Sequence, residues 1–303
     1  MKAEQPSISK IMDSVLIMRP KSSPYRLRRI GGKYDGAYLV PDDLDGIDAC
    51  FSPGVNNFKN FEDELTDVFG IKCHMCDYSS NVAQLKTPLR DGMQTFKKKW
   101  LDVDGGTDSI TLEDWIEELS PAVDRDLILQ MDIEGAEYRN LLNCKNSVLK
   151  RFRIIVLEVH HLHVVNDVVE FEKELGPLLR KLDKSFVCVH SHPNNCCGDF
   201  MLAETGLNIP NIHELTFLRR DRFDLVTTSD WHKPLIPHPL DISFNDRNNP
   251  PLFLSEAWCS KGSRDLASRI VIAKFQLDYL VFRFVRKAKS TIKSSLPFLS
   301  GSV

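Results

Sequence analysis

The sequence predicts an α/β fold built on a mostly parallel sheet with helices on both faces. From residue 47 onward, short apolar segments alternate with amphipathic ones, and this alternation is typical of right-handed βαβ units. The segment Phe152 to Val159 is apolar on both of its faces, as a central strand of a parallel sheet requires. With 303 residues, of which 42% are hydrophobic, the chain is long enough for one full α/β core.

The individual elements follow from local pattern. Asp35-Gly36 lies between two β-prone stretches in Leu27 to Val40 and predicts a hairpin. Thr111 with Asp114 resembles a capping box and marks the start of a helix. Strands are predicted over 47–52, 71–76, 127–131, 152–159, 186–189 and 213–218, the last at an edge. Helices are predicted over 60–69, 111–119, 137–142 and 168–182.

The two ends of the chain differ from the middle. We expect a lead-in over 1–25, the main domain over 26–255, and a basic amphipathic helix or tail over 256–303. Residues 264–293 alternate apolar side chains with Arg and Lys. Such a helix can lie on an anionic membrane surface or dock a partner. Packing on the sheet with a solvated basic face is the favoured interpretation.

Charge and composition narrow the class of protein. Lys and Arg number 39 against 42 Asp and Glu, so the net charge is −3. Nucleic acid is therefore not expected as a partner, because its binders usually have a basic bias. Neither a secretory signal over 1–18 nor a long apolar run is visible. The eight cysteines are scattered, which favours reduced thiols, so we expect a cytoplasmic location.

A cofactor pocket is indicated at the ends of the first two predicted parallel strands. Gly54 follows the strand 47–52, and Asp77, at the tip of the next strand, lies 23 positions beyond it. An acid at about that distance accepts hydrogen bonds from ribose hydroxyls. The G-x-G-x-x-G turn that holds a pyrophosphate is absent. The spacing thus favours a nucleoside cofactor without phosphates; alternatively, Asp77 is an ordinary turn residue.

Three later strand ends carry polar residues that are two positions apart. The pairs are Asp132 with Glu134, Glu158 with His160, and His190 with His192. Residues i and i+2 of an extended segment point the same way, and a cleft with carboxylates and imidazoles suits a general base or a divalent metal. The alternatives are a helix cap at Asp132 and histidines in solvated loops. The catalytic candidates are Asp132, Glu134, His160 and His190. The candidate metal ligands are Asp132, Glu158, His160, His190 and His192.

Four stretches, 29–40, 52–57, 131–137 and 189–195, resemble the FkbM-type methyltransferases. The most telling is the string Asp-Ile-Glu-Gly-Ala-Glu at 132–137. The resemblance runs from about residue 25 to about 250 and implies a Rossmann-like seven-stranded methyltransferase sheet, mostly parallel with one antiparallel edge strand. It also implies S-adenosylmethionine as methyl donor. Pro53 and Ala37 depart from the usual family runs.

The resemblance further implies cofactor contacts and an activity. The expected cofactor-binding residues are Asp35, Gly36, Gly54, Val55, Asn57, Glu62, Asp77, Ser79 and Asp132. The expected reaction is methylation of a hydroxyl on a sugar, a glycan or a small metabolite, with a divalent metal as a further candidate cofactor. Two other classes stay open: an inactive binding module with the same fold, and a nucleotide-dependent oxidoreductase or sugar-modifying enzyme.

Overall fold

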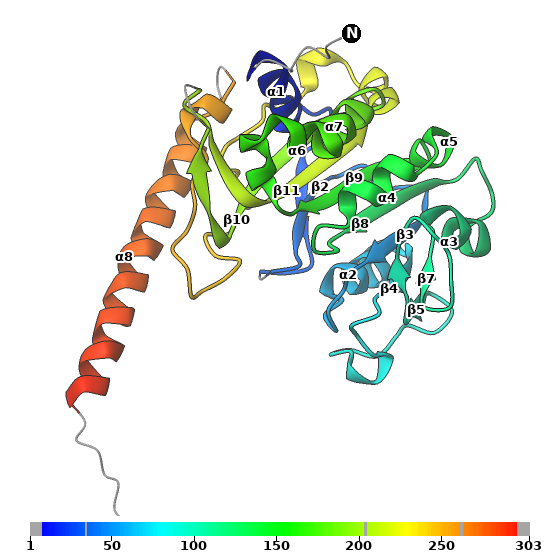
Figure 1. The fold of residues 1–303 in the computed structure, drawn as a ribbon, viewed down its shortest axis with the longest axis horizontal. Coiled ribbons are helices and arrows are strands. Elements are labelled where there is room, and N and C mark those ends of the chain that lie inside the picture. Colours follow the sequence, from blue (N-terminus) through cyan, green and yellow to red (C-terminus); the bar gives the residue numbers. More distant parts are fainter. Residues whose placement is uncertain (1–7, 34, 203–204, 261–262, 296–303) are drawn as a thin grey trace, which may run out of the picture.

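The structure, a computed structural model, describes residues 8–33, 35–202, 205–260 and 263–295 (Figure 1). A seven-stranded sheet forms its centre, in the spatial order β10-β11-β9-β8-β3-β4-β5. The mixed α/β fold with a mostly parallel sheet is therefore confirmed. Its strands are β3 (Ile47–Pro53), β4 (Lys72–Cys76), β5 (Gln94–Lys97), β8 (Asp126–Met131), β9 (Phe152–Val159), β10 (Phe186–Met201) and β11 (Asn208–Arg219).

Helices cover both faces of the sheet, as the sequence predicts. One face packs on α1 (Ile8–Val15), α3 (Leu112–Leu119), α4 (Glu137–Asn143), α5 (Asn146–Leu149), α6 (Val168–Lys173) and α7 (Leu175–Asp183). The other packs on α2 (Asn60–Phe69) and on the hairpin of β1 (Leu27–Ile30) and β2 (Tyr38–Pro41). Strand β9 contributes apolar side chains to both faces of the sheet. Ile155 and Leu157 pack in the core on the first face, and Ile154 and Val156 pack in the core on the other.

Smaller elements confirm local signals. The Asp35-Gly36 hairpin is present as β1 and β2, and the Thr111 side chain accepts a hydrogen bond from the Asp114 amide at the start of α3. A short parallel pair, β6 (Trp100–Leu101) and β7 (Ser109–Ile110), lies outside the main sheet.

The strand order reverses at β3. From β3 the chain runs outward through β4 to β5, and then returns to the other side of β3 as β8. In open α/β sheets, ligands bind beyond the carboxyl ends of the strands at such a switch point. Gly54, after β3, and Asp132, after β8, lie at this point. The fold thus places both residues where the sequence analysis expects a ligand.

The expectation of an antiparallel edge strand is wrong in one respect. Strand β11 is antiparallel, but it lies between β9 and β10, and the edge strand is β10. An edge position would leave one side of this strand open to solvent. Glu214 and Thr216 are instead buried, at 6% and 2% exposure, because their side of the strand faces other polar groups of the protein.

Four other differences concern individual elements. The helix expected over 168–182 is divided into α6 and α7, since Pro177 has no amide hydrogen to continue the helix. Strand β5 has no clear strand signal in the sequence, because its residues, Gln-Thr-Phe-Lys, are mostly polar. Strand β10 runs on to Met201, so His190 and His192 lie within it. Adjacent Cys196 and Cys197 form a disulfide, against the expectation of reduced thiols.

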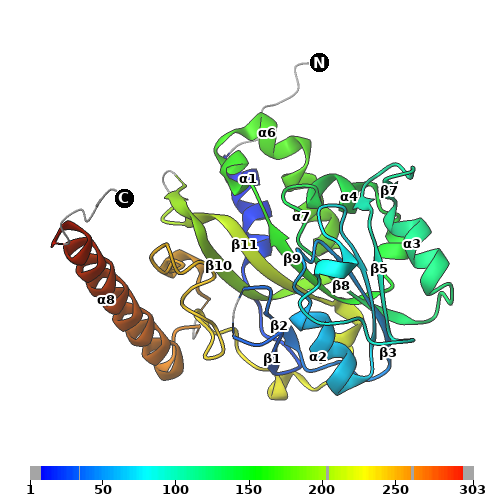
Figure 2. The ribbon, with the colours of Figure 1, turned by 90° about the horizontal axis from the view of Figure 1, so that it is seen from below.

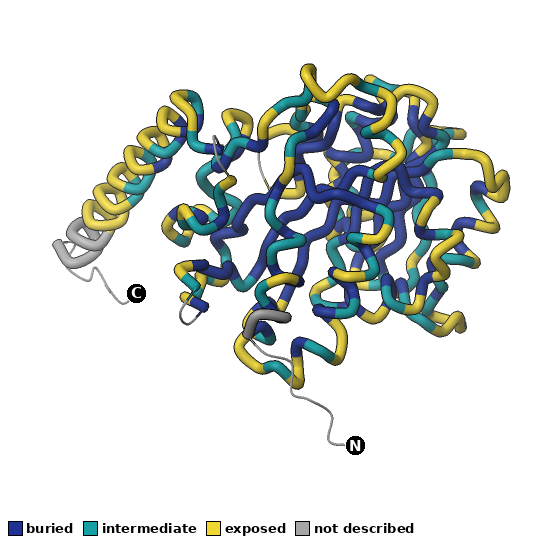
Figure 3. Tube along the Cα trace, turned by 90° about the horizontal axis from the view of Figure 1, so that it is seen from above, coloured by how far each residue is buried: buried dark blue, intermediate teal, exposed yellow. Residues whose placement is uncertain are grey.

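The long helix α8 (Leu266–Ser295) leaves the body of the protein (Figures 1 and 2). Val271 and Phe275 are buried at its base, whereas most later positions are exposed (Figure 3). The helix, expected to pack on the sheet, is therefore buried against the body mainly at its first turns. Among the described residues, no helix is both long and apolar enough to cross a bilayer.

Candidate functional site

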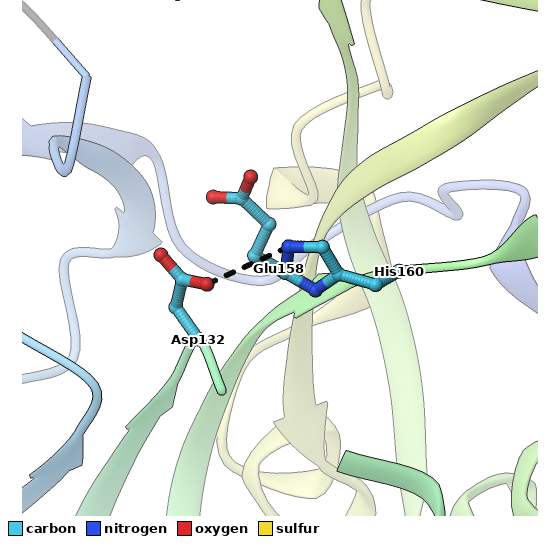
Figure 4. Close-up of side chains that lie close together, drawn as sticks. All are labelled: Asp132, Glu158 and His160. Carbon is cyan, nitrogen blue, oxygen red and sulfur yellow. Dashed lines mark ion pairs between the residues drawn. The ribbon is translucent and has the colours of Figure 1, made fainter. Parts of the chain in front are cut away.

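A carboxylate and histidine cluster lies at the switch-point edge of the sheet. Asp132 follows β8, Glu158 lies near the end of β9, and His160 follows that strand (Figure 4). One ligand atom from each of the three lies within 4.8 Å of the others. The His160 Nε2 is 3.7 Å from the Asp132 carboxylate. The structure thus brings together three of the residues predicted to act in catalysis or to bind metal.

Glu137 orients the His160 ring. The Nδ1 of His160 lies 3.1 Å from Glu137 Oε1, and this oxygen also accepts hydrogen bonds from the amides of Ile133 and Gly135. Glu137 is fully buried. With Nδ1 engaged, Nε2 faces Asp132 and Glu134, whose carboxylate lies 3.5 Å away. His160 is therefore held with one ring nitrogen toward the cluster.

The pKa values of Asp132, Glu158 and His160 are all raised. Burial raises the pKa of Asp132 to about 7, and Glu134 and Glu137 add to the rise while His160 opposes it. Burial by itself would lower the pKa of His160. The hydrogen bond to Glu137 and the nearby carboxylates outweigh it, so the His160 pKa is raised. Burial also raises the pKa of Glu158. Groups shifted in this way are common at functional sites.

A second acidic group shares Glu158. Ligand atoms of Asp35, Glu158 and Glu214 lie within 4.8 Å of one another, and Asn245 donates to both Asp35 and Glu214. The turn between β1 and β2 carries Asp35 to this position although it is far from Glu158 in the sequence. The adjacent Gly36 is exposed, with φ of 76°. Several carboxylates thus gather around one edge of the sheet.

Glu62 is linked to the same cluster through a buried chain of hydrogen bonds. The Ser52 hydroxyl contacts both Glu62 and Gln130. Gln130 donates to the Tyr38 hydroxyl over 3.4 Å, and this hydroxyl donates to Glu158 over 3.3 Å. Burial raises the pKa of Glu62 to about 7. Glu62, predicted to contact a cofactor, therefore bonds to neighbouring strands inside the protein.

Asp77 holds the loops around the first two strand ends. Its Oδ1 accepts from the amide and the hydroxyl of Ser79 and from the Ser80 amide, and its Oδ2 accepts from the Asn56 amide and the Ser80 hydroxyl. These hydrogen bonds outweigh burial and lower the Asp77 pKa. A carboxylate offers about four lone-pair positions. A ribose hydroxyl would therefore have to displace or share one of these donors.

Gly54 is required by the protein's own backbone. Its φ is 87°, and a Cβ placed on it would lie 1.6 Å from the Asp132 carbonyl oxygen. The Asp132 amide donates to the Pro53 carbonyl over 3.2 Å, so the two strand ends meet directly. Beside them, Val55 is buried and Asn57 accepts from the Asn81 amide. The loop 54–57 thus follows the end of β3, the strand end at which the sequence places it.

His190 and His192 belong to a separate cluster. Their rings stack with centroids 6.5 Å apart, and both face the buried Asp241, at 3.1 and 3.7 Å. Burial would lower the His192 pKa, but Asp241 outweighs this and raises it. No metal-ligand group among the described residues joins either histidine to Asp132. The structure therefore divides the predicted metal ligands into two sets.

Several important residues were not recognised from the sequence. Glu137 stands in the string 132–137, but nothing local shows that its carboxylate meets His160. Tyr38, Glu214 and Asp241 come from separate parts of the chain and contribute through the fold. The polar residues of the buried strand β11 were the one available signal for Glu214.

Comparison with known proteins gives one match. No curated protein matches the chain. Residues 84–185 match a family model described as the methyltransferase FkbM domain. This span includes Asp132, Glu137, Glu158 and His160 of the cluster. The match over residues 84–185 agrees with the resemblance to FkbM-type methyltransferases that the motif at 132–137 predicted.

Proposed function

We propose that this protein is an S-adenosylmethionine-dependent methyltransferase that methylates a hydroxyl of a sugar, a glycan or a small metabolite. The observation that carries the proposal is the pairing of His160 with Glu137 at the switch-point edge of the sheet. A family of methyltransferases supplies the reaction class, and this pair supplies a group able to remove a proton from an alcohol.

The residues present fit this donor. S-adenosylmethionine supplies an electrophilic methyl group on a positively charged sulfonium. The partly buried Asp132 and the exposed Glu134 lie at the switch point, and the ionised form of either carboxyl group attracts a positive charge. The loop 54–57, with Asp77 and Ser79, would hold the nucleoside, and Asp35 and Gly36 lie on the turn that faces the acidic cluster.

His160 is the proposed general base. Its Nε2 would take the proton of the acceptor hydroxyl, and Glu137, bonded to Nδ1, would stabilise the resulting imidazolium. Asp132 and Glu134 lie close enough to favour the same charged form. The protein thus has a base, a group that orients it and an adjacent negative environment.

The surrounding acids favour a polyhydroxyl acceptor. Asp35, Glu158 and Glu214 lie together beside the proposed base, and their carboxyl oxygens can accept hydrogen bonds. Hydroxyl groups donate them, so a sugar or a similar polyol matches this edge. A group of acids is also an unfavourable place for the pyrophosphate of a dinucleotide, which speaks against the oxidoreductase alternative.

A divalent metal is the second candidate for activating the hydroxyl. Oxygen and imidazole ligands from Asp132, Glu158 and His160 lie within 4.8 Å of one another, and this mixed set suits Mg²⁺, Mn²⁺ or Zn²⁺. His190 and His192 lie with Asp241 instead. Activity that survives exhaustive chelation, without stimulation by added Mg²⁺ or Mn²⁺, would reject the metal.

The first test separates donor binding from turnover. Calorimetric titration should show binding of S-adenosylmethionine and none of NAD. A methyl-transfer assay on a panel of glycans and polyols should then identify an acceptor. His160→Gln should lower kcat by about 10²–10⁴-fold with little change in donor affinity. The exposed His163 provides the matched control, His163→Gln, which should retain activity.

The outcomes distinguish the proposal from its rivals. Donor binding without turnover on any acceptor would favour a binding module with a methyltransferase fold. NAD binding without S-adenosylmethionine binding would favour the oxidoreductase class. Full activity of His160→Gln would show that the proposed base is wrong.

A further inference from the structure

Helix α8 presents an apolar stripe that no described part of the protein covers. Its first turns are held to the body by Val271 and Phe275, which are 7% and 1% exposed. The opposite side carries large apolar residues that are 60–74% exposed: Leu266, Ile270, Leu277, Leu280 and Phe284. These residues follow one another at steps of three or four, with the small Ala273 filling the position between Ile270 and Leu277. They therefore share one face of the helix.

The charges that border this stripe are positive. Residues 266–295 contain seven basic residues and one acid. Arg269, Lys274 and Arg283 are exposed, and a helical turn of 3.6 residues places each of them beside or near the stripe. The one acid, Asp278, bonds to the Ser243 hydroxyl on the body side. The outward surface of α8 thus combines apolar residues with a basic border.

The groove between α8 and the body adds to this surface. It has a volume of about 650 Å³ and is lined by Phe244, Phe282, Arg286 and Lys289, among others. Its walls are mainly apolar, and its cationic groups can meet an anionic headgroup. The groove is therefore chemically similar to the outward stripe.

Pairing of α8 with a second copy of the chain is electrostatically unfavourable. The spacing of the stripe is compatible with a coiled-coil seam. In such a pair, however, the flanking positions would bring Arg269, Lys274 or Arg283 of one copy near basic residues of the other. Stable coiled coils usually place opposite charges there. The basic border instead complements an anionic surface.

We propose that α8 docks on an anionic lipid surface, with its outward stripe entering the headgroup region and its basic residues meeting the lipid charges. Apolar burial and attraction to anionic lipid both contribute to such binding. The helix lies in the interface and does not cross the bilayer, consistent with its hydropathy. This inference is independent of the proposed methyl transfer.

Docking would place the acidic cluster near the lipid. Ser243, which bonds to Asp278 of α8, lies two residues before Asn245, which donates to Asp35 and Glu214. This short connection links the base of the exposed helix segment to the candidate site. A docked helix would therefore hold the site at a limited distance from the membrane surface.

Flotation of the full chain with vesicles tests the proposal. Vesicles of phosphatidylcholine with 30% phosphatidylserine should bind the protein, and phosphatidylcholine alone should bind it far less. The experiment uses purified protein at about 0.1 M salt, where charge attraction acts over about 10 Å. Raising the salt to 1 M should weaken binding. Absence of binding to the anionic vesicles, or equal binding to both, would overturn the proposal.

Two sets of variants locate the surface. Arg269→Glu, Lys274→Glu and Arg283→Glu should each reduce vesicle binding by roughly fivefold or more, and Leu277→Glu with Phe284→Glu should abolish it. The matched control is Val68→Glu with Val123→Glu, at apolar positions of the body that are 64% and 83% exposed. The control should bind like the unaltered chain. Thermal melting checks that every variant is folded.

Sedimentation equilibrium decides between lipid and a second copy. The protein without vesicles should be monomeric, and Leu277→Glu should leave its mass unchanged. A dimer that Leu277→Glu dissociates would contradict the proposal. The proposal would also be contradicted if the control, Val68→Glu with Val123→Glu, lost vesicle binding as strongly as the α8 variants do.

Discussion

The Nδ1 of His160 lies 3.1 Å from Oε1 of Glu137, a carboxylate with no exposed surface. A fully buried acid beside an imidazole fixes the ring and favours its protonated form. Because the other ring nitrogen faces Asp132 and Glu134, this one contact sets the direction in which His160 can exchange a proton.

The first prediction concerns Glu137→Gln. The amide oxygen can still accept from the Ile133 and Gly135 amides, but the negative charge beside His160 is lost. We expect kcat to fall by about 10–100-fold, with donor affinity preserved in calorimetry. His163→Gln serves as the control. A variant that loses activity only because it is unfolded would show a lowered melting temperature; unchanged kcat in a folded variant would refute the role of Glu137.

The second prediction concerns the pH dependence of the reaction. A general base acts in its neutral form, and the His160 pKa is raised from 6.5. Activity should therefore rise with pH, with a midpoint above 6.5. Burial raises the Asp132 pKa to about 7, so the midpoint belongs to the interacting groups together. In Glu137→Gln it should move downward. A profile of kcat/KM from pH 5 to 9 measures both; a midpoint that does not respond to Glu137→Gln would contradict the assignment.

The third prediction concerns Asp77. The pKa of Asp77 is lowered from 3.8 in the folded protein. The ionised carboxylate therefore stabilises the fold at a pH above the pKa of Asp77 in the unfolded chain. This stabilisation is lost as the pH falls through the pKa of Asp77 in the folded protein. Asp77→Asn should lower the free energy of unfolding by about 1.5–3 kcal/mol at pH 7. The difference should shrink below about pH 4. Urea unfolding at several pH values measures this, with the exposed Asp91→Asn as control. Equal stability at pH 7 would show that the loop does not depend on the Asp77 charge.

Donor binding by the same variant gives separate information. If Asp77 acts only through the loop, the folded Asp77→Asn protein at low temperature should retain most of its affinity for S-adenosylmethionine. A loss of more than about tenfold in a protein shown to be folded would instead support direct contact between Asp77 and the ribose.

The fourth prediction concerns Gly54. A Cβ at this position would lie 1.6 Å from the Asp132 carbonyl oxygen, and its φ of 87° is unfavourable for other residues. Gly54→Ala should force β3 and β8 apart at their ends and cost about 3 kcal/mol or more. Gly92→Ala is the control: it also has positive φ, but nothing lies within 4 Å of its Cβ, so about 1 kcal/mol is expected. Thermal unfolding measures the loss of stability in each variant. Equal losses would show that only the positive φ matters and that the clash with the Asp132 carbonyl oxygen does not.

Much of the fold could be predicted because its signals are local. The helix over 60–69 and the strand over 152–159 have the predicted bounds, since apolar spacing reports directly on which faces are buried. The hairpin at Asp35-Gly36 and the cap at Thr111 depend on a few neighbouring residues. The break before Pro177 was also visible in principle, because proline interrupts helices for a local reason.

The candidate site was predicted only in part. The i, i+2 pattern indicated that Glu158 and His160 could act together, and the structure places them in one group with Asp132. The same pattern at His190 and His192 led to a different neighbour, Asp241. The pattern shows which side chains share a direction, but it contains no information on what the fold places opposite them.

The sequence by itself determined the class of fold, the strand ends at Gly54, Asp77 and Asp132, and the resemblance to one methyltransferase family, because short-range pattern and motif carry these. Only the tertiary structure decided that β11 lies inside the sheet, that Glu137 meets His160, and that α8 extends from the body with an apolar stripe exposed. These relationships join residues through packing across the sheet and around its edges, and their energies depend on distances in space that no local stretch of sequence encodes.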